Sequence, residues 1–106
     1  QAKNLPILYT GVVIFGPMFE EIFFRGFLFK GLENSFLGGH GAVFISSFLF
    51  AAIHLQYDQT IMLFILLPMA ILLGYSRLMS KSLVLPILLH SINNLAACLF
   101  THFEIY

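Results

Sequence analysis

Four long apolar runs, joined by short polar connections, make up most of this sequence. The first run begins at residue 5, is interrupted by charged side chains after residue 19, and resumes to residue 32. The others cover residues 42–55, 59–76 and 82–103. A helix that crosses a bilayer needs about 20 mainly apolar residues and must satisfy its own backbone hydrogen bonds. The runs therefore predict about four membrane helices.

The amino-acid composition favours lipid over water as the surrounding solvent. Hydrophobic residues make up 59% of the chain and charged residues only 9%, whereas a soluble globular domain is about 25% charged. The chain has 13 Phe residues, too many to bury in a soluble core of 12.0 kDa. Five basic and five acidic residues cancel, which argues against nucleic acid as a partner. The single Cys98 excludes a disulfide framework.

The connections between the runs are short, covering residues 33–41, 56–59 and 77–82. Residues 38–41, Gly-Gly-His-Gly, are typical of a loop. Short connections place consecutive helices antiparallel, so the predicted fold is all-α, a polytopic transmembrane helical bundle. The chain starts without Met, and we expect residues 1–106 to be a single core from a longer membrane protein.

The membrane orientation follows from the basic residues near the ends of the runs. Lys30, Arg77 and Lys81 belong to one face of the bundle, whereas Lys3 alone belongs to the other. The face with three basic residues is therefore predicted to be cytoplasmic.

Three charged residues, Glu20, Glu21 and Arg25, interrupt the first apolar run. A charge at the bilayer centre costs roughly 2.5–3.5 kcal/mol on the insertion scale. Glu21 and Arg25 are spaced i, i+4 and can pair along one helix face. Glu20 then points about 100° away around the helix. A structural ion-pair cluster is one interpretation, but it needs only one carboxylate. A second carboxylate, desolvated beside a like charge, suits a general base.

Three further polar residues lie in or beside the apolar runs. His54 follows the second run, and His90 and Asn94 share one face of the fourth at i, i+4 spacing, presenting two hydrogen-bonding groups to one point. At about 1.5 Å per residue, Glu20 and His54 lie roughly 18 Å from the same face of the bundle, and His90 about 12 Å. We expect these groups to converge at similar depth. Interhelical hydrogen bonding remains the alternative interpretation of His90 and Asn94.

Two kinds of chemistry fit one carboxylate with two His and an Asn. Glu20, His54 and His90 could hold a catalytic zinc ion, which keeps one position open. Equally, Glu20 and His54 could deprotonate a water while His90 and Asn94 donate to a developing oxyanion. No HExxH motif is present, and no Ser-Lys, Ser-His or Asp pair points to serine or aspartyl proteolysis.

The motifs together resemble a known family. Residues 20–25 read EExxxR, residues 50–54 read FxxxH, and residues 90–94 read HxxxN, each on a separate hydrophobic run. This order resembles the CPBP family of CAAX proteases and bacteriocin-processing enzymes, also called the ABI family. These are intramembrane proteases that include the type II CAAX prenyl endopeptidases. The resemblance spans about residues 10–100.

The resemblance implies an intramembrane endopeptidase that hydrolyses peptide bonds of membrane-associated substrates. By that analogy Glu20 and His54 activate the water, His90 and Asn94 stabilise the oxyanion, and Glu21 and Arg25 position the motif. The family is usually labelled a metalloprotease, and a metal-free glutamate mechanism is the other view, so a divalent metal such as zinc and no metal both remain open.

The implied partners are membrane lipid and a membrane-anchored protein or peptide, prenylated CAAX proteins being the best-known substrates. A multi-pass protein of a bacterial plasma membrane is expected. A non-catalytic protein for bacteriocin immunity or scaffolding, or a transporter fragment in which the charges line an ion path, is the alternative.

Overall fold

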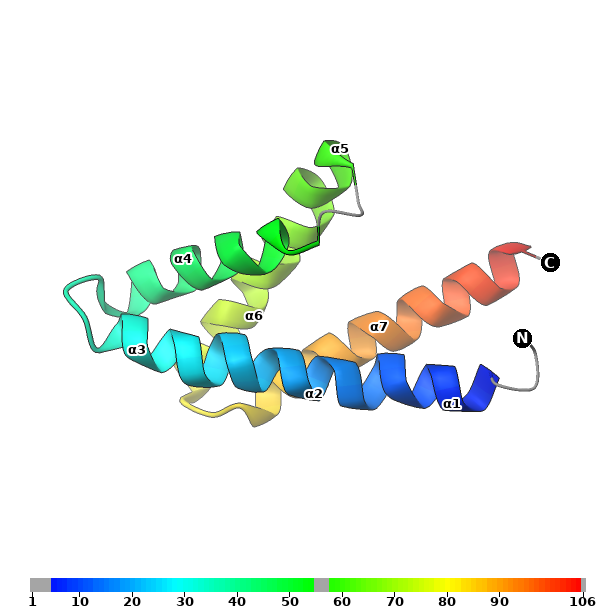
Figure 1. The fold of residues 1–106 in the computed structure, drawn as a ribbon, viewed down its shortest axis with the longest axis horizontal. Coiled ribbons are helices and arrows are strands. Elements are labelled where there is room, and N and C mark those ends of the chain that lie inside the picture. Colours follow the sequence, from blue (N-terminus) through cyan, green and yellow to red (C-terminus); the bar gives the residue numbers. More distant parts are fainter. Residues whose placement is uncertain (1–4, 55–57, 106) are drawn as a thin grey trace.

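The computed structural model describes residues 5–54 and 58–105, which fold into helices joined by short connections, with no strand in those two ranges. The first helix runs without a break over residues 5–33 and is seen along the length of Figure 1. It consists of α1 (Leu5–Thr10), the π-helical segment η2 (Gly11–Phe15), α2 (Gly16–Glu21), the π-helical segment η3 (Ile22–Leu28) and α3 (Phe29–Glu33).

Pro17 accounts for the first change of helical register. A proline has no N–H and cannot take part in the hydrogen-bond ladder of a helix. The N–H of Gly16, just before it, bonds to the carbonyl of Gly11, five residues back. This wider turn is the hydrogen-bond pattern of a π-helix, which is common at functional sites.

The second helix, α4 (Gly38–Ala52), begins earlier than the sequence predicts. Residues 38–41 were expected to form a loop, and that prediction is wrong. Within this stretch only Gly38 has a positive φ, +69°. A Cβ on Gly39 would lie 2.7 Å from Leu78 Cδ1, so this glycine allows close packing between helices rather than a turn. The helix ends at Ala52, and residues 53 and 54 are not helical, so it stops before the predicted end at residue 55.

The third helix covers residues 59–80 and is made of α5 (Gln59–Ile61), the π-helical segment η4 (Met62–Leu66) and α6 (Leu67–Ser80). It begins where the Asp58 side chain accepts a hydrogen bond from the Ile61 N–H, at 2.9 Å, an N-cap. It ends at Ser80, and the next residue, Lys81, has a left-handed backbone with φ 58°. The helix therefore extends beyond the predicted run, which ended at residue 76.

The last helix is α7 (Val84–Ile105), which starts where the Ser82 hydroxyl accepts a hydrogen bond from the Val84 N–H. It packs against α6, α2 and η2, whereas α4 packs against α6 and α3. In Figure 1, α7 lies beside α2 and diverges from α1 toward the two termini, and the connections after α3 and after α6 lie toward one end of the bundle. This is the antiparallel order expected from short connections.

The exterior of the bundle is apolar, as a lipid-facing surface requires. Helices Pro6–Glu33 and Gln59–Ser80 are long and apolar enough to cross a membrane, while Gly38–Ala52 and Val84–Phe100 are shorter apolar helices. Large side chains such as Phe27 and Phe64 are at least three-quarters exposed. The prediction of an all-α bundle of membrane helices is confirmed.

The interior of the bundle contains two small apolar clusters with charged groups among them. Phe24, Phe50 and Ala70 form one cluster, which joins the 5–33 helix to α4 and α6. Among the residues whose burial the structure describes, the buried polar side chains are those of Glu21, Arg25, Ser46, Ser47 and His90. Buried charge at this depth is costly unless it is paired and hydrogen-bonded, so the candidate site is built around these residues.

Candidate active site

The predicted ion pair between Glu21 and Arg25 is present and fully buried. Arg25 Nη1 donates to Glu21 Oε2 at 3.0 Å. The other terminal nitrogen, Nη2, donates to the carbonyl of Ala70 on α6 at 2.7 Å. The guanidinium also lies over the Phe50 ring of α4, with Cζ 4.8 Å from the ring centroid. Arg25 thus connects the 5–33 helix with two of its neighbours.

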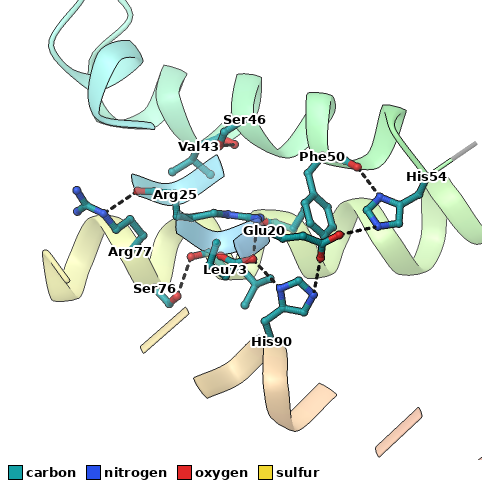
Figure 2. A network of polar contacts seen from close by, with 12 residues as sticks. Glu20, Arg25, Val43, Ser46, Phe50, His54, Leu73, Ser76, Arg77 and His90 are labelled. Atoms are coloured by element: carbon teal, nitrogen blue, oxygen red, sulfur yellow. Dashed lines mark hydrogen bonds and ion pairs between the residues drawn. The ribbon is translucent and has the colours of Figure 1, made fainter. Parts of the chain in front are cut away.

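Glu20 faces away from this pair, toward two histidines from two other parts of the chain. Its Oε2 lies 3.8 Å from His54 Nε2, just beyond the end of α4. Its Oε1 lies 3.4 Å from His90 Nε2 on α7. Figure 2 shows the Glu20 carboxylate between the two imidazole rings. The structure therefore brings together the three residues that depth along the helices predicts to converge.

The second nitrogen of each imidazole has a partner of its own. His54 Nδ1 lies 2.7 Å from the carbonyl of Phe50, and His90 Nδ1 lies 2.7 Å from Glu21 Oε2. A carbonyl and a carboxylate paired with arginine are acceptors, so we assign the Nδ1 proton to each ring from these partners. Partners of this kind fix the tautomer and the orientation of an imidazole.

The Glu20 carboxylate and the two Nε2 atoms form the centre of the candidate site. With Nδ1 carrying the proton, Nε2 of a neutral imidazole is an acceptor, and so is a carboxylate. Separations of 3.4 and 3.8 Å are longer than a typical hydrogen bond to oxygen. A molecule that donates two protons, such as water, can bond to both kinds of acceptor at once. The Glu20 side chain is 35% exposed, so the centre can be reached from outside.

The i, i+4 spacing predicted that Asn94 and His90 would direct their polar groups to one point. The structure does not show this arrangement. Asn94 Nδ2 donates to the carbonyl of Val12 in η2, at 2.9 Å, while His90 contacts the two carboxylates. The side chain that was expected to act beside His90 is thus engaged by the backbone of the 5–33 helix. The physical cause is the hydrogen-bond register before Pro17.

Phe50 and Arg77, for which the sequence predicted no role in the site, also contribute to its geometry. The Phe50 ring lies 4.6 Å from the His54 ring and 5.7 Å from the His90 ring, centroid to centroid. It fills the space between the two imidazoles and Arg25, and its place in the FxxxH motif was the available signal. Arg77 Nε donates to the carbonyl of Arg25 at 2.9 Å, a contact for which the sequence carries no signal.

The described residues do not provide a metal-binding set. Over residues 5–54 and 58–105, no group of three or more His, Cys, Asp or Glu side chains is arranged to hold a metal ion. The set suggested from the sequence, Glu20, His54 and His90, does not fit a metal ion in this arrangement.

Comparison with known proteins identifies the family. The sequence matches the family model of the type II CAAX prenyl endopeptidase Rce1-like proteins over residues 2–96. The chain belongs to this family. All residues of the candidate site fall inside the matched range, and the resemblance noted from the three motifs is confirmed.

Two curated relatives match most of this chain. The membrane-embedded CAAX protease MroQ of Staphylococcus aureus (strain USA300) is 31% identical over 98 residues, which cover 88% of this chain and 38% of the relative. An uncharacterized 24.3 kDa protein of Escherichia coli is 33% identical over 93 residues, 83% of this chain and 42% of the relative. The chain spans about two fifths of the length of these relatives. No solved structure matches it significantly. The family and the first relative support a membrane protease role.

Proposed function

We propose that the chain is the catalytic core of an intramembrane endopeptidase that hydrolyses peptide bonds of membrane-associated substrates. The observation that carries this proposal is the Glu20 carboxylate set between two imidazole Nε2 atoms, 3.4 and 3.8 Å away. Membership of a protease family supports it independently. A lone structural ion pair would account for Glu21 and Arg25 and would leave this second carboxylate without a purpose.

In the first step a water molecule is held between Glu20 and His54. Each accepts one hydrogen bond from the water, because His54 Nδ1 carries the proton and bonds to Phe50. The water oxygen attacks the carbonyl carbon of the scissile bond as Glu20 accepts a proton from it. Such general-base catalysis contributes typically about 10²–10⁴ in rate.

In the second step the tetrahedral intermediate carries a negatively charged oxygen. His90 takes part in this step as an imidazolium, with Nδ1–H bonded to Glu21 and Nε2–H donating to that oxygen. The family resemblance assigns Asn94 a donor role as well, but its Nδ2 is hydrogen-bonded to the Val12 carbonyl, so we give it no direct part in this step. The C–N bond then breaks, and the proton held by Glu20 passes to the leaving amine. Donors preorganised in a water-poor site give the largest stabilisation in reactions of this kind.

Glu21 and Arg25 act on this chemistry through His90. Glu21 Oε2 accepts hydrogen bonds from both Arg25 Nη1 and His90 Nδ1, at 3.0 and 2.7 Å. Because Arg25 is fully buried and its other terminal nitrogen donates to Ala70, Glu21 has little freedom to move. The pair thus holds the His90 ring with Nε2 directed at Glu20.

The substrate we propose is a peptide or protein anchored in the membrane. The site lies among helices whose outer surfaces are apolar, so a substrate has to approach from the bilayer or its surface. One relative is named a CAAX protease, which makes a CAAX-type peptide the first candidate. For a multi-pass protein of a bacterial plasma membrane, a leader peptide is the second.

The test is cleavage of both substrates by the full-length protein in membrane vesicles. The panel compares the wild type with Glu20→Ala and with Glu33→Ala, a matched change at the end of α3. We expect cleavage by the wild type and by Glu33→Ala but none by Glu20→Ala. Cleavage that a zinc chelator abolishes would contradict the metal-free step. Full biological function in Glu20→Ala would instead favour an immunity or scaffolding role.

A further inference from the structure

The carbonyl of Val12 is left without a backbone partner by the register before Pro17. In an α-helix this carbonyl would accept from the N–H of Gly16, but that N–H bonds to Gly11. In the π-helical register the partner would be residue 17, and proline has no N–H. Neither donor of the helix therefore reaches Val12. A bare carbonyl is costly within a membrane-spanning helix, where water is scarce.

Asn94 supplies the missing donor from another helix. Its Nδ2 lies 2.9 Å from the Val12 carbonyl, and α7 packs against both η2 and α2. His90 lies one helical turn before Asn94 on the same face of α7, and Glu20 lies about two turns after Val12 on the first helix. The hydrogen bond thus ties the helix that carries His90 to the helix that carries Glu20, beside the site.

We infer that Asn94 is a positioning residue that fixes His90 opposite Glu20 by capping the carbonyl that Pro17 exposes. The inference rests on the proposed function for its effect on catalysis, but the cap itself does not depend on that function. Pro17 and Asn94 then act as one unit. Restoring an N–H at position 17 should remove the need for the amide at position 94.

The chain contains a matched arrangement that serves as a control. In η4 the N–H of Leu67 bonds to the carbonyl of Met62, five residues back, and Pro68 follows. The same register shift before a proline therefore occurs in the 59–80 helix. The hydrogen bond of Asn94 is made to Val12, so a change at Pro68 should not alter the effect of a change at Asn94.

The experiment is a double-mutant cycle on the full-length protein in detergent. Pro17→Ala and Asn94→Ala are made alone and together, and the cycle of Pro68→Ala with Asn94→Ala is the control. The melting temperature and kcat are measured for every variant, with KM measured beside kcat. The melting temperature measures how much the hydrogen bond from Asn94 to the Val12 carbonyl stabilises the fold. The value of kcat measures how well His90 is placed opposite Glu20. The effect of Asn94→Ala is measured between two proteins with the same residue at position 17. Any packing lost with the Pro17 ring is therefore present in both proteins and cancels.

We expect Asn94→Ala to lower the melting temperature when Pro17 is present and to change it much less in the Pro17→Ala variant. We also expect it to lower kcat at least about tenfold with Pro17 present, since small misplacements are costly in catalysis. In the Pro17→Ala variant the loss of kcat should be smaller, and KM should change little in either background. The Pro68 cycle should be additive.

Two results would overturn the inference. If Asn94→Ala lowers the melting temperature equally with Pro17 and in the Pro17→Ala variant, Asn94 does not cap the carbonyl that Pro17 exposes. If it lowers kcat by the same factor in both, Asn94 does not position His90 through that cap. An inactive wild type would refute the proposed function, and the melting temperatures would then still decide whether Asn94 caps the Val12 carbonyl.

Discussion

At the scale of single residues, Arg25 explains how charge is tolerated in the core. One guanidinium bonds to Glu21 and Ala70 and lies over the Phe50 ring. A buried pair of this kind is weak evidence for net stability, but removing one member leaves an uncompensated charge and is strongly destabilising. The i, i+4 spacing was sufficient to predict the pair. It could not predict the contacts of Arg25 with other helices.

Replacing Arg25 with Ala should therefore destabilise the fold severely. Arg25→Ala leaves the Glu21 carboxylate buried without its ion pair, and we expect a loss of about 3–5 kcal/mol in the free energy of unfolding. The measurement is thermal unfolding of the full-length protein in detergent. Lys30→Ala, an exposed cation on the same helix, is the control and should change stability by less than about 0.5 kcal/mol. A wild-type melting temperature in Arg25→Ala would contradict the role given to the pair.

The candidate site shows which residues a sequence can predict and which it cannot. The convergence of Glu20, His54 and His90 follows from their depth along antiparallel helices, so counting residues predicts it. The partner of Asn94 depends on a change of helical register at Gly11–Phe15. An i, i+4 spacing carries no information about such a change. The absence of an N–H at Pro17 was the only available signal.

At the scale of the elements, glycines decide how closely the helices approach. Gly74 on α6 is buried, and a Cβ there would lie 3.0 Å from Val43 Cγ1 and 3.5 Å from the Val43 backbone Cα on α4. The β-branched Val43 side chain has little rotamer freedom in a helix, so it cannot move aside easily. Gly39, in the first turn of α4, makes a similar close approach to the Leu78 side chain on α6.

A methyl group at Gly74 should therefore force α4 and α6 apart. We expect Gly74→Ala to lower the free energy of unfolding by about 1–3 kcal/mol, the usual cost of overpacking. Gly31→Ala is the matched control, because a Cβ at Gly31 meets nothing within 4 Å. Alanine there should stabilise the helix by up to about 1 kcal/mol. The same gain in melting temperature for both variants would show that α4 and α6 are not in close contact at Gly74.

At the scale of the whole molecule, the bundle presents one end with exposed cations. Lys30 and Lys81 are exposed near the connections after α3 and α6, whereas Arg77 donates to the carbonyl of Arg25 and lies over the Phe29 ring. Basic residues near helix ends favour the cytoplasmic side. The all-α fold and its antiparallel order followed from the apolar runs alone, because the bilayer admits few other structures.

The orientation can be measured by labelling single cysteines in intact cells. In a background with Cys98→Ser and every other native cysteine of the full-length protein replaced, Ser35→Cys lies in the connection after α3 and Asp58→Cys lies before α5. If the end with Lys30 and Lys81 is cytoplasmic, a membrane-impermeant maleimide should label Asp58→Cys and leave Ser35→Cys unlabelled until the cells are opened. Labelling of Ser35→Cys in intact cells would reverse the assignment.

The measurement that tests the central claim most directly is the rate of peptide cleavage by Glu20→Gln in the full-length protein. Gln keeps the size of the side chain but cannot accept the proton of the attacking water. We expect kcat to fall by about 10²–10⁴, while membrane insertion and melting temperature stay at the wild-type level. Glu33→Gln, measured beside it, should cleave at the wild-type rate. Cleavage by Glu20→Gln within a few-fold of the wild type would show that Glu20 is not the base.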